Sequence, residues 1–380
     1  MTATDTAASA GTAAEPQAGY VPPPYPYDRL DEVSAVAAAV PGGAIDLSIG
    51  TPCDPPPANV VAALSAAPDE AMGYPASIGS VGLRQAFARW AKRRLGATVD
   101  PGKEVAACVG TKEFVATTPQ YLKLRTPSRD TVLYPAISYP TYEMGAILAQ
   151  CRAVPYLTLD DISPEDAARA LVLWVNSPSN PTGELVDLGE AAAWGREHDV
   201  PVLSDECYAE FTWDGPPRTI LEHGTQGVLA VHSLSKRDNF AGARVGFYAG
   251  DPEIVHYLRE VRKHAGFMVP GPVQSAAILA LDDDEHVEAQ RARYLGRLKR
   301  MQQVLAACGL DAPLPAGGFY LWTPVPDGDA WAAARVLAER AGIVSSPGEF
   351  YGPDGSAFLR IAVVQPDELI ELAAQRVGLA

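Results

Sequence analysis

A lysine, two hydroxyls and an arginine follow one short apolar run of the chain. The run Val228 to His232 is followed by Ser233, Ser235 and Lys236, and Arg244 comes eight residues after the lysine. Hydroxyls and cations at a strand end can bind an anion such as a phosphate, and a lysine there can also attack a carbonyl. The GxxxxGK[ST] spacing of a P-loop is missing, and Ser-x-Ser-Lys alone is a weak signal. The cluster by itself leaves both chemistries open.

Two further polar clusters lie upstream, each directly after an apolar run. They are NSPSNPTG at residues 176–183 and DECY at residues 205–208. Asn180, Asp205 and Lys236 are therefore spaced 25 and 31 residues apart, one at the end of each run. Because ligands of parallel sheets bind beyond the carboxyl ends of the strands, this spacing predicts one shared site.

Two more segments could contribute to that site. Thr111 and Lys112 follow the run that begins at Val105 and open a predicted helix, whose unpaired backbone N–H groups favour a phosphate. Tyr139 lies in PAISYPTY, after the next apolar run, and could stack on a planar ligand. Together these segments predict an anion site next to an aromatic face.

The elements that must position these residues alternate between short apolar runs and helical patterns. A largely parallel sheet in an α/β fold is expected from that alternation. The predicted strands are Val105 to Val109, Thr131 to Tyr134, Leu171 to Val175, Val202 to Ser204, Val228 to His232 and Val245 to Tyr248, and the helices include Leu188 to His198 and Asp284 to Leu305.

The pattern changes after residue 310, and this predicts a second, smaller α+β unit. We expect a tail at residues 1–20, an arm at 21–45 that joins the small domain, a large domain at 46–308 and a small domain at 309–380. In the small domain the pattern indicates strands Phe319 to Trp322 and Phe358 to Val363, with helices Ala330 to Ala341 and Pro366 to Val377.

Composition excludes several classes of protein. The 380 residues include 30 Lys+Arg and 46 Asp+Glu, a formal net charge of −16, which argues against nucleic-acid and anionic-membrane partners. The five cysteines are scattered without CxxC spacing, so no metal site is expected and Cys207 is interpreted as a packing residue. The first basic residue is Arg29, so the positively charged start of a signal peptide is missing. We therefore expect a cytoplasmic protein.

The motifs in combination resemble those of pyridoxal-phosphate enzymes of fold type I, and of the class I/II aminotransferases in particular. NSPSNPTG, SDECY, HSLSK and FLRIAVV carry the resemblance, which covers roughly residues 45–375. The resemblance implies a large domain with a mostly parallel, mixed seven-stranded sheet plus a small α+β domain, pyridoxal 5'-phosphate as the cofactor, and a homodimer.

The resemblance also implies roles around the cofactor ring. Lys236 would form the Schiff base with the cofactor aldehyde and then move the Cα proton. Asp205 would pair with the ring nitrogen, Asn180 and Tyr208 would bind the ring's phenolic oxygen, and Tyr139 would stack on the ring. Lys236, Asp205 and Tyr208 are thus the expected catalytic residues.

Further roles concern the phosphate and the substrate. Arg360 would bind the substrate α-carboxylate, with a backbone N–H at Gly50 and Asn180 beside it. Tyr74 would reach the phosphate of the neighbouring subunit. The remaining expected phosphate ligands are Thr111, Lys112, Ser233, Ser235 and Arg244.

Each residue also has a plain structural interpretation. Asp205 could cap a helix, Tyr139 and Tyr208 could be core aromatics, and Arg360 could be a surface charge at a strand edge. Asn180 and Gly50 could merely shape turns. The joint, ordered occurrence of the motifs favours the functional interpretation.

A finer resemblance points to actinobacterial-type N-succinyldiaminopimelate aminotransferases. It rests on PYPYDRL, IDLSIGTPCDPPP and VRKHAGFMVPGPVQSAAILALDDDEH, and implies amino transfer from L-glutamate to N-succinyl-2-amino-6-oxopimelate in lysine synthesis. Arg262 or Lys263 could then bind a distal carboxylate. Asp238 and Ala243 depart from the family pattern, which leaves open a related aminotransferase of specialised metabolism, or a pyridoxal-phosphate lyase or cyclase, with another substrate. A non-catalytic regulatory module is the third alternative.

Overall fold

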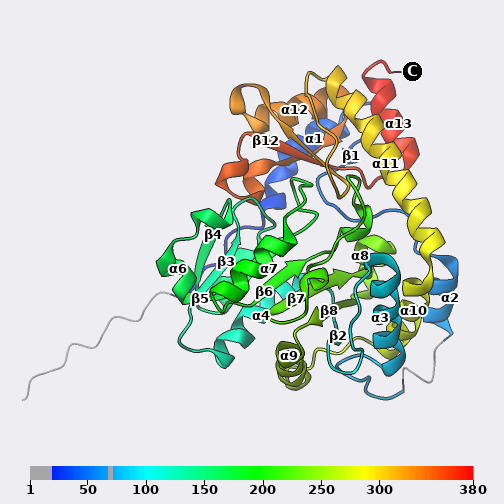
Figure 1. Ribbon diagram of the computed structural model, residues 1–380. Helices are drawn as coiled ribbons and strands as arrows, with labels where there is room; N and C mark the ends of the chain where they lie inside the picture. The colour runs from blue at the N-terminus through cyan, green and yellow to red at the C-terminus, as the bar shows by residue number, and fades with distance from the viewer. Residues whose placement is uncertain (1–18, 67–71, 380) are drawn as a thin grey trace, which may run out of the picture.

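The computed structural model describes residues 19–66 and 72–379, so most of the predicted tail at 1–20 lies outside the described residues. One large sheet forms the centre of the molecule. A smaller sheet lies next to it and is drawn above it in Figure 1. None of the helices in the described ranges has the length and apolarity that a membrane crossing needs.

The large sheet has seven strands in the order β2-β8-β7-β6-β5-β3-β4. β8 is antiparallel to both of its neighbours, and the other strand pairs are parallel. This confirms the expected mixed, mostly parallel sheet. The strands are β2 (Val105–Cys108), β3 (Thr131–Pro135), β4 (Arg152–Tyr156), β5 (Ala170–Asn176), β6 (Val202–Asp205), β7 (Val228–Ser233) and β8 (Gly246–Gly250).

Helices cover both faces of the large sheet, which explains why its inner strands are apolar along their whole length. Every residue of β5 and β7 is buried. One face packs against α3 (Val81–Leu95), α7 (Leu188–Glu197) and α10 (Gly271–Asp282). The other face packs against α4 (Thr111–Arg125), α5 (Thr141–Leu148) and α9 (Pro252–His264).

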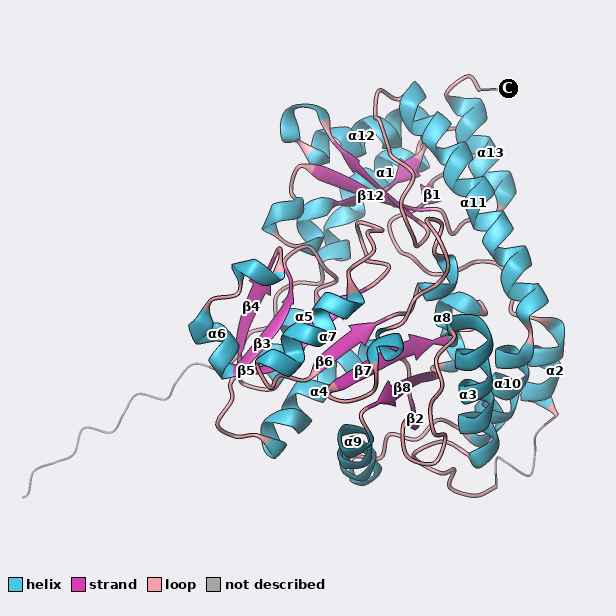
Figure 2. Ribbon diagram, in the orientation of Figure 1, coloured by secondary structure: helices cyan, strands magenta, loops and turns pink. Residues whose placement is uncertain are grey.

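The small sheet, drawn in magenta above the large sheet in Figure 2, is antiparallel, in the order β11-β12-β9. It packs in an apolar core of its own. Its strands are β9 (Tyr320–Pro324), β11 (Ser346–Pro347) and β12 (Phe358–Ala362). The helices packed in the same core are α1 (Asp31–Ala38), α11 (Asp284–Ala307), α12 (Ala330–Ala341) and α13 (Asp367–Arg376). Figure 1 shows α11 running along one side of the molecule from the large sheet to the small one.

The N-terminal segment returns to the C-terminal part of the chain. β1 (Ile45–Asp46) pairs in parallel with β10 (Ile343–Val344), and α1 packs in the same apolar core as α12. The remaining helices are α2 (Ala58–Ser65), α6 (Pro164–Arg169) and α8 (Leu234–Arg237). The short helix α8 carries Lys236.

Four strands were missing from the sequence prediction. β4 lies at the edge of the sheet, and its Arg152 and Pro155 are exposed, so its pattern is not that of a buried strand. β1, β10 and β11 have two residues each and are too short to show a period. Pairing with distant segments, rather than local pattern, forms these strands.

Candidate active site

A cavity of about 490 Å³ opens at the carboxyl ends of β5, β6 and β7, beside the N-terminus of α4. All but one of the predicted site residues line it. They are Gly50, Thr111, Lys112, Tyr139, Asn180, Asp205, Tyr208, Ser233, Ser235, Lys236, Arg244 and Arg360. Tyr74 does not line the cavity; its side chain is 97% exposed. The order of the central strands explains the convergence, because β5, β6 and β7 are neighbours in the sheet.

The amine of Lys236 projects into this cavity and donates a hydrogen bond to the backbone carbonyl of Gly50. Burial lowers the pKa of Lys236 to about 8, and the positive charges of Arg360 and Arg244 act in the same direction. About a tenth of this lysine is therefore an uncharged amine at about pH 7, and an uncharged amine can act as a nucleophile or a base.

Asp205 lies at the end of β6 with both carboxylate oxygens bound. Oδ1 accepts a hydrogen bond from the N–H of Cys207 at 3.2 Å, and Oδ2 accepts one from the hydroxyl of Tyr142 at 3.1 Å. Burial raises the pKa of Asp205, while the hydrogen bonds from Cys207 and Tyr142 lower it. These donors orient a half-buried carboxylate that is suited to pairing with a cation.

Arg360 is a buried guanidinium, 1% exposed, between the rings of Tyr320 and Tyr351 at 4.4 and 4.6 Å. Its hydrogen bonds in the described structure go to neutral oxygens. They are Asn180 Oδ1 at 2.8 Å, Tyr27 Oη at 3.2 Å and the carbonyl of Ser48. Nε is buried without a partner among the described residues. A buried cation in this setting is suited to an anionic ligand.

Gly50 occupies a position where no side chain fits. A Cβ there would overlap the hydroxyl of Tyr320 and lie 2.8 Å from its ring atoms Cε1 and Cζ. Tyr320 in turn pairs with Tyr208 through their hydroxyls at 2.8 Å. The backbone at Gly50 therefore packs directly against Tyr320. Its carbonyl accepts the hydrogen bond from Lys236 at the cavity wall.

The opposite side of the cavity has the character of an anion cradle. α4 begins after Gly110 without a side-chain cap, so its first N–H groups are unpaired by side chains. Ser233 and Ser235 share a hydrogen bond at 2.8 Å, and Arg244 lies against Gly110. A Cβ at Gly110 would be 2.9 Å from Cζ of Arg244, so glycine allows the guanidinium to reach the helix end.

These groups fit the cofactor that the sequence resemblance implies. Pyridoxal 5'-phosphate needs an amine for its aldehyde, a carboxylate for its ring nitrogen and a cradle for its phosphate. Lys236, Asp205 and the Arg244 side of the cavity supply these three features within one cavity. No group of three or more potential ligands in the described part of the chain is arranged to hold a metal ion.

Eleven of the lining residues were not predicted as site residues, and five of these carry an aromatic ring or a thiol: Tyr25, Tyr27, Tyr142, Cys207 and Tyr320. Cys207 was interpreted as packing, but its thiol lies 3.1 Å from the hydroxyl of Thr111 within the cavity wall. The PYPY arm and the SDECY motif were visible signals for three of the five. Tyr142 is the last residue of PAISYPTY, a segment in which only Tyr139 was predicted to act, whereas nothing in the sequence pattern marks Tyr320.

The two basic residues suggested for a distal carboxylate lie elsewhere. Arg262 is buried and pairs with Glu113 at 2.6 Å, and Lys263 pairs with Glu260 at 2.8 Å on an exposed surface. Asp238 is also outside the cavity lining: it is fully buried and pairs with Arg237 at 2.6 Å. Asp238, which departs from the family pattern, therefore stabilises α8 through Arg237 and does not line the cavity.

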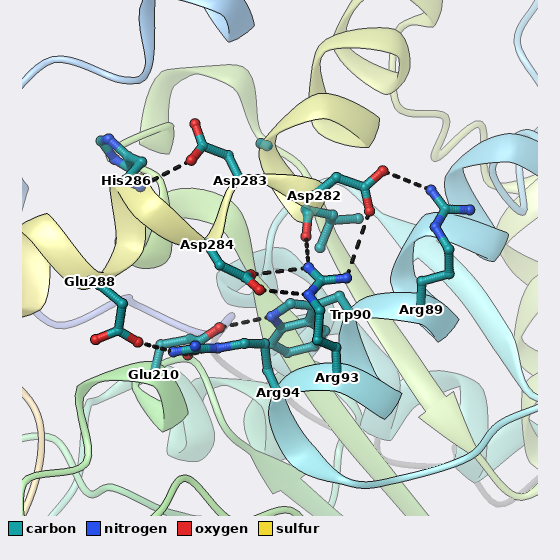
Figure 3. A network of polar contacts seen from close by, with 12 residues as sticks. Arg89, Trp90, Arg93, Arg94, Glu210, Asp282, Asp283, Asp284, His286 and Glu288 are labelled. Atoms are coloured by element: carbon teal, nitrogen blue, oxygen red, sulfur yellow. Dashed lines mark hydrogen bonds and ion pairs between the residues drawn. The ribbon is translucent and has the colours of Figure 1, made fainter.

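A buried polar network holds α8 from behind the cavity. Arg237, next to Lys236, donates to Glu210 at 3.2 Å, and Trp90 and Arg94 of α3 donate to the same carboxylate at 2.8 and 2.9 Å. Figure 3 shows Trp90 and Arg94 directed at Glu210, and Arg93 directed at Asp284 at the start of α11. Glu210 thereby connects the lysine helix to α3.

Comparison with known proteins agrees with this geometry. Residues 43–377 match the family model described as aminotransferase class I and II. The chain is 42% identical to the 4-dedimethylamino-4-oxo-anhydrotetracycline transaminase OxyQ of Streptomyces rimosus, over 93% of this chain and 98% of that one. It is 41% identical to a probable aminotransferase of Mycobacterium tuberculosis, over 93% and 85%.

A solved structure described as a probable N-succinyldiaminopimelate aminotransferase of Thermus thermophilus is also similar. It matches with a TM-score of 0.81 at 31% identity, over 93% of this chain and 100% of that one. The similar proteins thus include several kinds of aminotransferase. They do not single out the N-succinyldiaminopimelate aminotransferases.

Proposed function

The chain belongs to the class I and II aminotransferases, which use pyridoxal 5'-phosphate, and we propose that it transfers an amino group from L-glutamate to an oxo acceptor of specialised metabolism. The observation that carries the proposal is the pair formed by Lys236 and Arg360 in one cavity. One is an amine with a lowered pKa, and the other is a buried cation without an acidic partner among the described residues.

In this proposal Arg360 binds and orients the α-carboxylate of the amino acid. The rings of Tyr320 and Tyr351 exclude water from the guanidinium, and Asn180 fixes one of its N–H groups. A bidentate pair between guanidinium and carboxylate would orient the Cα–H bond of the substrate relative to Lys236.

When bound, the cofactor supplies an electron-withdrawing ring that stabilises negative charge at the substrate Cα. Asp205, supported by Tyr142 and the N–H of Cys207, would pair with the ring nitrogen. Lys236 takes the Cα proton on Nζ and returns one, since its pKa of about 8 is close to the working pH. Tyr208, whose hydroxyl pairs with that of Tyr320, would bind the ring oxygen.

The identity of the acceptor is proposed from the relatives. The 42% identity to a transaminase named for an oxo-tetracycline supports an acceptor ketone of specialised metabolism. N-succinyl-2-amino-6-oxopimelate is the second candidate, supported by the 31% identical structure described as a probable N-succinyldiaminopimelate aminotransferase. The tyrosines of the arm, Tyr25 and Tyr27, line the cavity and could pack on either acceptor.

A homodimer is part of the proposal. Tyr74 is 97% exposed and lies outside the cavity of its own subunit. A tyrosine in that position would act on the cofactor phosphate only across a subunit boundary, as the motif resemblance implies. Two cavities completed by exchanged tyrosines are a natural consequence of two-fold symmetry.

The test is a pair of half-reactions on the holoenzyme. L-glutamate alone should convert the yellow enzyme to the pyridoxamine form, with release of 2-oxoglutarate. The glutamate-treated enzyme is then offered polycyclic ketones and N-succinyl-2-amino-6-oxopimelate. Release of ammonia and an oxo acid without an acceptor would instead identify a lyase. No spectral change with any amino donor would contradict the proposed transfer.

A further inference from the structure

Two segments of the chain meet at the amine of Lys236. One is the lysine segment, residues 234–239, which begins with α8, and the other is the β1–α2 connection, residues 47–57. They touch at the cavity wall, where Lys236 donates a hydrogen bond to the carbonyl of Gly50. β1 packs in the core of the small sheet and α2 in the core of the large sheet, so the connection passes from one core to the other.

A glutamine of α11 joins the same two segments behind the cavity. Oε1 of Gln290 accepts a hydrogen bond from Nδ2 of Asn239 at 3.2 Å, and Nε2 of Gln290 donates one to Oδ2 of Asp54 at 2.8 Å. Gln290 is 0% exposed and is not among the residues that line the cavity. Its amide therefore connects the lysine segment to the β1–α2 connection without contacting a ligand in the cavity.

Asp54 is held firmly at its end of this link. Arg297 donates to both of its carboxylate oxygens, at 2.7 and 2.9 Å, and Nη1 of Arg293 lies 3.6 Å from Oδ1. Burial raises the pKa of Asp54, but the hydrogen bonds from Arg297 and Gln290 outweigh it and hold the pKa below its usual value. The carboxylate is therefore charged at neutral pH, and the hydrogen bond from Gln290 is charge-assisted.

Asn239 directs its side chain from the lysine segment toward the β1–α2 connection. Its φ of +53° lies in the left-handed region, which asparagine tolerates better than most residues. Nδ2 of Asn239 lies 3.4 Å from the carbonyl oxygen of Pro55, a direct contact with the connection. Gln290 reinforces this contact, because its Oε1 accepts from the same nitrogen and is itself oriented by a hydrogen bond from Arg293 at 2.7 Å.

The spacing of these residues on α11 gives the link a rigid base. Gln290, Arg293 and Arg297 are three and four residues apart, so they lie on one face of the helix. α11 runs from the large sheet to the small one (Figure 1), and Arg297 also pairs with Asp367 at the start of α13 at 2.5 Å. The helix that bridges the two sheets thus carries the residue that joins the two segments.

We propose that Gln290 is a positioning residue for Lys236. By binding Asp54 and Asn239 together, it fixes the separation between the two segments and holds the amine in one direction beside the Gly50 carbonyl. Without the link, the segments separate and the amine samples more directions, so attack on the cofactor aldehyde becomes slower. The role rests on the Schiff-base function proposed for Lys236.

The test compares two ligands of the apoprotein, pyridoxal 5'-phosphate and pyridoxine 5'-phosphate, the second of which has an alcohol in place of the aldehyde. Borohydride quenching at successive times, with mass analysis of the Lys236 peptide, measures the rate of covalent capture of the first. Tryptophan fluorescence measures the binding of the second. Gln290→Met keeps the length of the side chain and loses the amide. It should slow capture about tenfold and leave the dissociation constant of pyridoxine 5'-phosphate unchanged, because the nucleophile rather than the cavity is displaced.

Hydrogen exchange of the apoprotein measures the link itself. Peptides from residues 47–57 and 234–239 should exchange about tenfold faster in Gln290→Met, since two hydrogen bonds are lost, while the strands of the large sheet keep the wild-type rate. Gln303→Met is the matched control, because it removes the same amide from an exposed position on the same helix. Its capture rate and its exchange should equal those of the wild type.

Gln290→Glu takes the place of Gln290→Met if the latter does not fold, because it keeps the acceptor for Asn239 and loses only the donor to Asp54. It should slow capture and speed exchange mainly in residues 47–57. Weaker binding of both ligands, faster exchange throughout the protein, or an unchanged capture rate would each overturn the role of Gln290 and leave the function of Lys236 intact. Capture by the wild type at another lysine would contradict the function of Lys236 itself, and with it the role of Gln290.

Discussion

The hydroxyl of Tyr142 donates a hydrogen bond to Oδ2 of Asp205 across 3.1 Å, from the first turn of α5 to the end of β6. Burial raises the pKa of Tyr142 well above 10, so this hydroxyl remains a donor throughout the neutral range. The carboxylate that we place at the cofactor nitrogen is therefore supported by the last residue of PAISYPTY, a segment in which only Tyr139 was assigned a role.

Tyr142→Phe should shift the acid limb of the activity profile to higher pH. The lost donor lowers the pKa of Asp205 in the wild type, so its removal raises that pKa further above its usual value. One hydrogen bond to a charged group corresponds to about one pH unit or more. The profile of kcat/KM against pH measures the shift. The control is Tyr121→Phe, because Tyr121 is a buried tyrosine of α4 outside the cavity. Identical profiles for the wild type and both variants would refute the role of Tyr142 in lowering the pKa of Asp205.

Covalent capture of the cofactor by the apoprotein should follow the titration of Lys236. Because burial lowers its pKa to about 8, the uncharged nucleophile becomes the major form above about pH 8 rather than above the usual 10.5. Borohydride trapping across a pH series, followed by mass analysis of the peptide that contains Lys236, reports the midpoint. Lys236→Ala should show neither trapping nor turnover. A midpoint near 10.5 would show that the lysine is not desolvated.

Gly50→Ala should reduce activity by about tenfold or more and destabilise the fold. The added methyl overlaps the hydroxyl of Tyr320, so it must displace either the Tyr208–Tyr320 pair or the segment beside Lys236. Overpacking of this kind costs about 1–3 kcal/mol. Steady-state kinetics and urea unfolding measure the two effects. Gly296→Ala on α11, where a Cβ meets no atom within 4 Å, should leave activity intact and stabilise slightly.

Glu210→Gln should destabilise the protein by about 3–5 kcal/mol, because it leaves the buried Arg237 and the half-buried Arg94 with one charge partner fewer. Glu288→Gln is the matched control: its carboxylate also pairs with Arg94 but is 56% exposed, so a loss below about 1 kcal/mol is expected. Urea unfolding at neutral pH compares them. Equal losses in the two variants would contradict the buried network.

The same carboxylate has a pH signature. Burial raises the pKa of Glu210, but the charges of Arg237 and Arg94 outweigh it and hold the pKa below 4.5. Its contribution is therefore complete above about pH 4.5 and is lost as pH falls through the lowered value. The Glu210→Gln variant should lack this component of acid unfolding.

Mixed dimers test the proposed exchange of Tyr74. Tyr74→Ala and Lys236→Ala are each expected to impair the enzyme. If Tyr74 acts in the partner's cavity, a mixed dimer contains one intact site and one doubly altered site, so an equal mixture should recover about a quarter of wild-type activity. If Tyr74 acts in its own subunit, every site in the mixed dimer carries one lesion and no activity returns. Light scattering establishes the oligomeric state first.

Much of the candidate site could be predicted because its chemistry lies in short local motifs. Asn180, Asp205 and Lys236 each follow a run of apolar residues, and such runs are typical of the buried strands β5, β6 and β7. The expectation for Arg262 and Lys263 was less successful, since a basic pair on a helix carries no information about its acidic neighbours. Glu113 and Glu260 bind these two residues outside the cavity.

The sequence by itself determined the family, the cofactor and the charged groups that line the cavity, because residue types and their order carry that chemistry. Only the tertiary structure decided which of these groups touch. The sheet order brings β5, β6 and β7 together, and it places Tyr142 against Asp205, 63 residues later in the chain. The return of the arm places Tyr27 on Arg360, 333 residues away. Contacts over such separations depend on the packing of whole layers, which no local pattern contains.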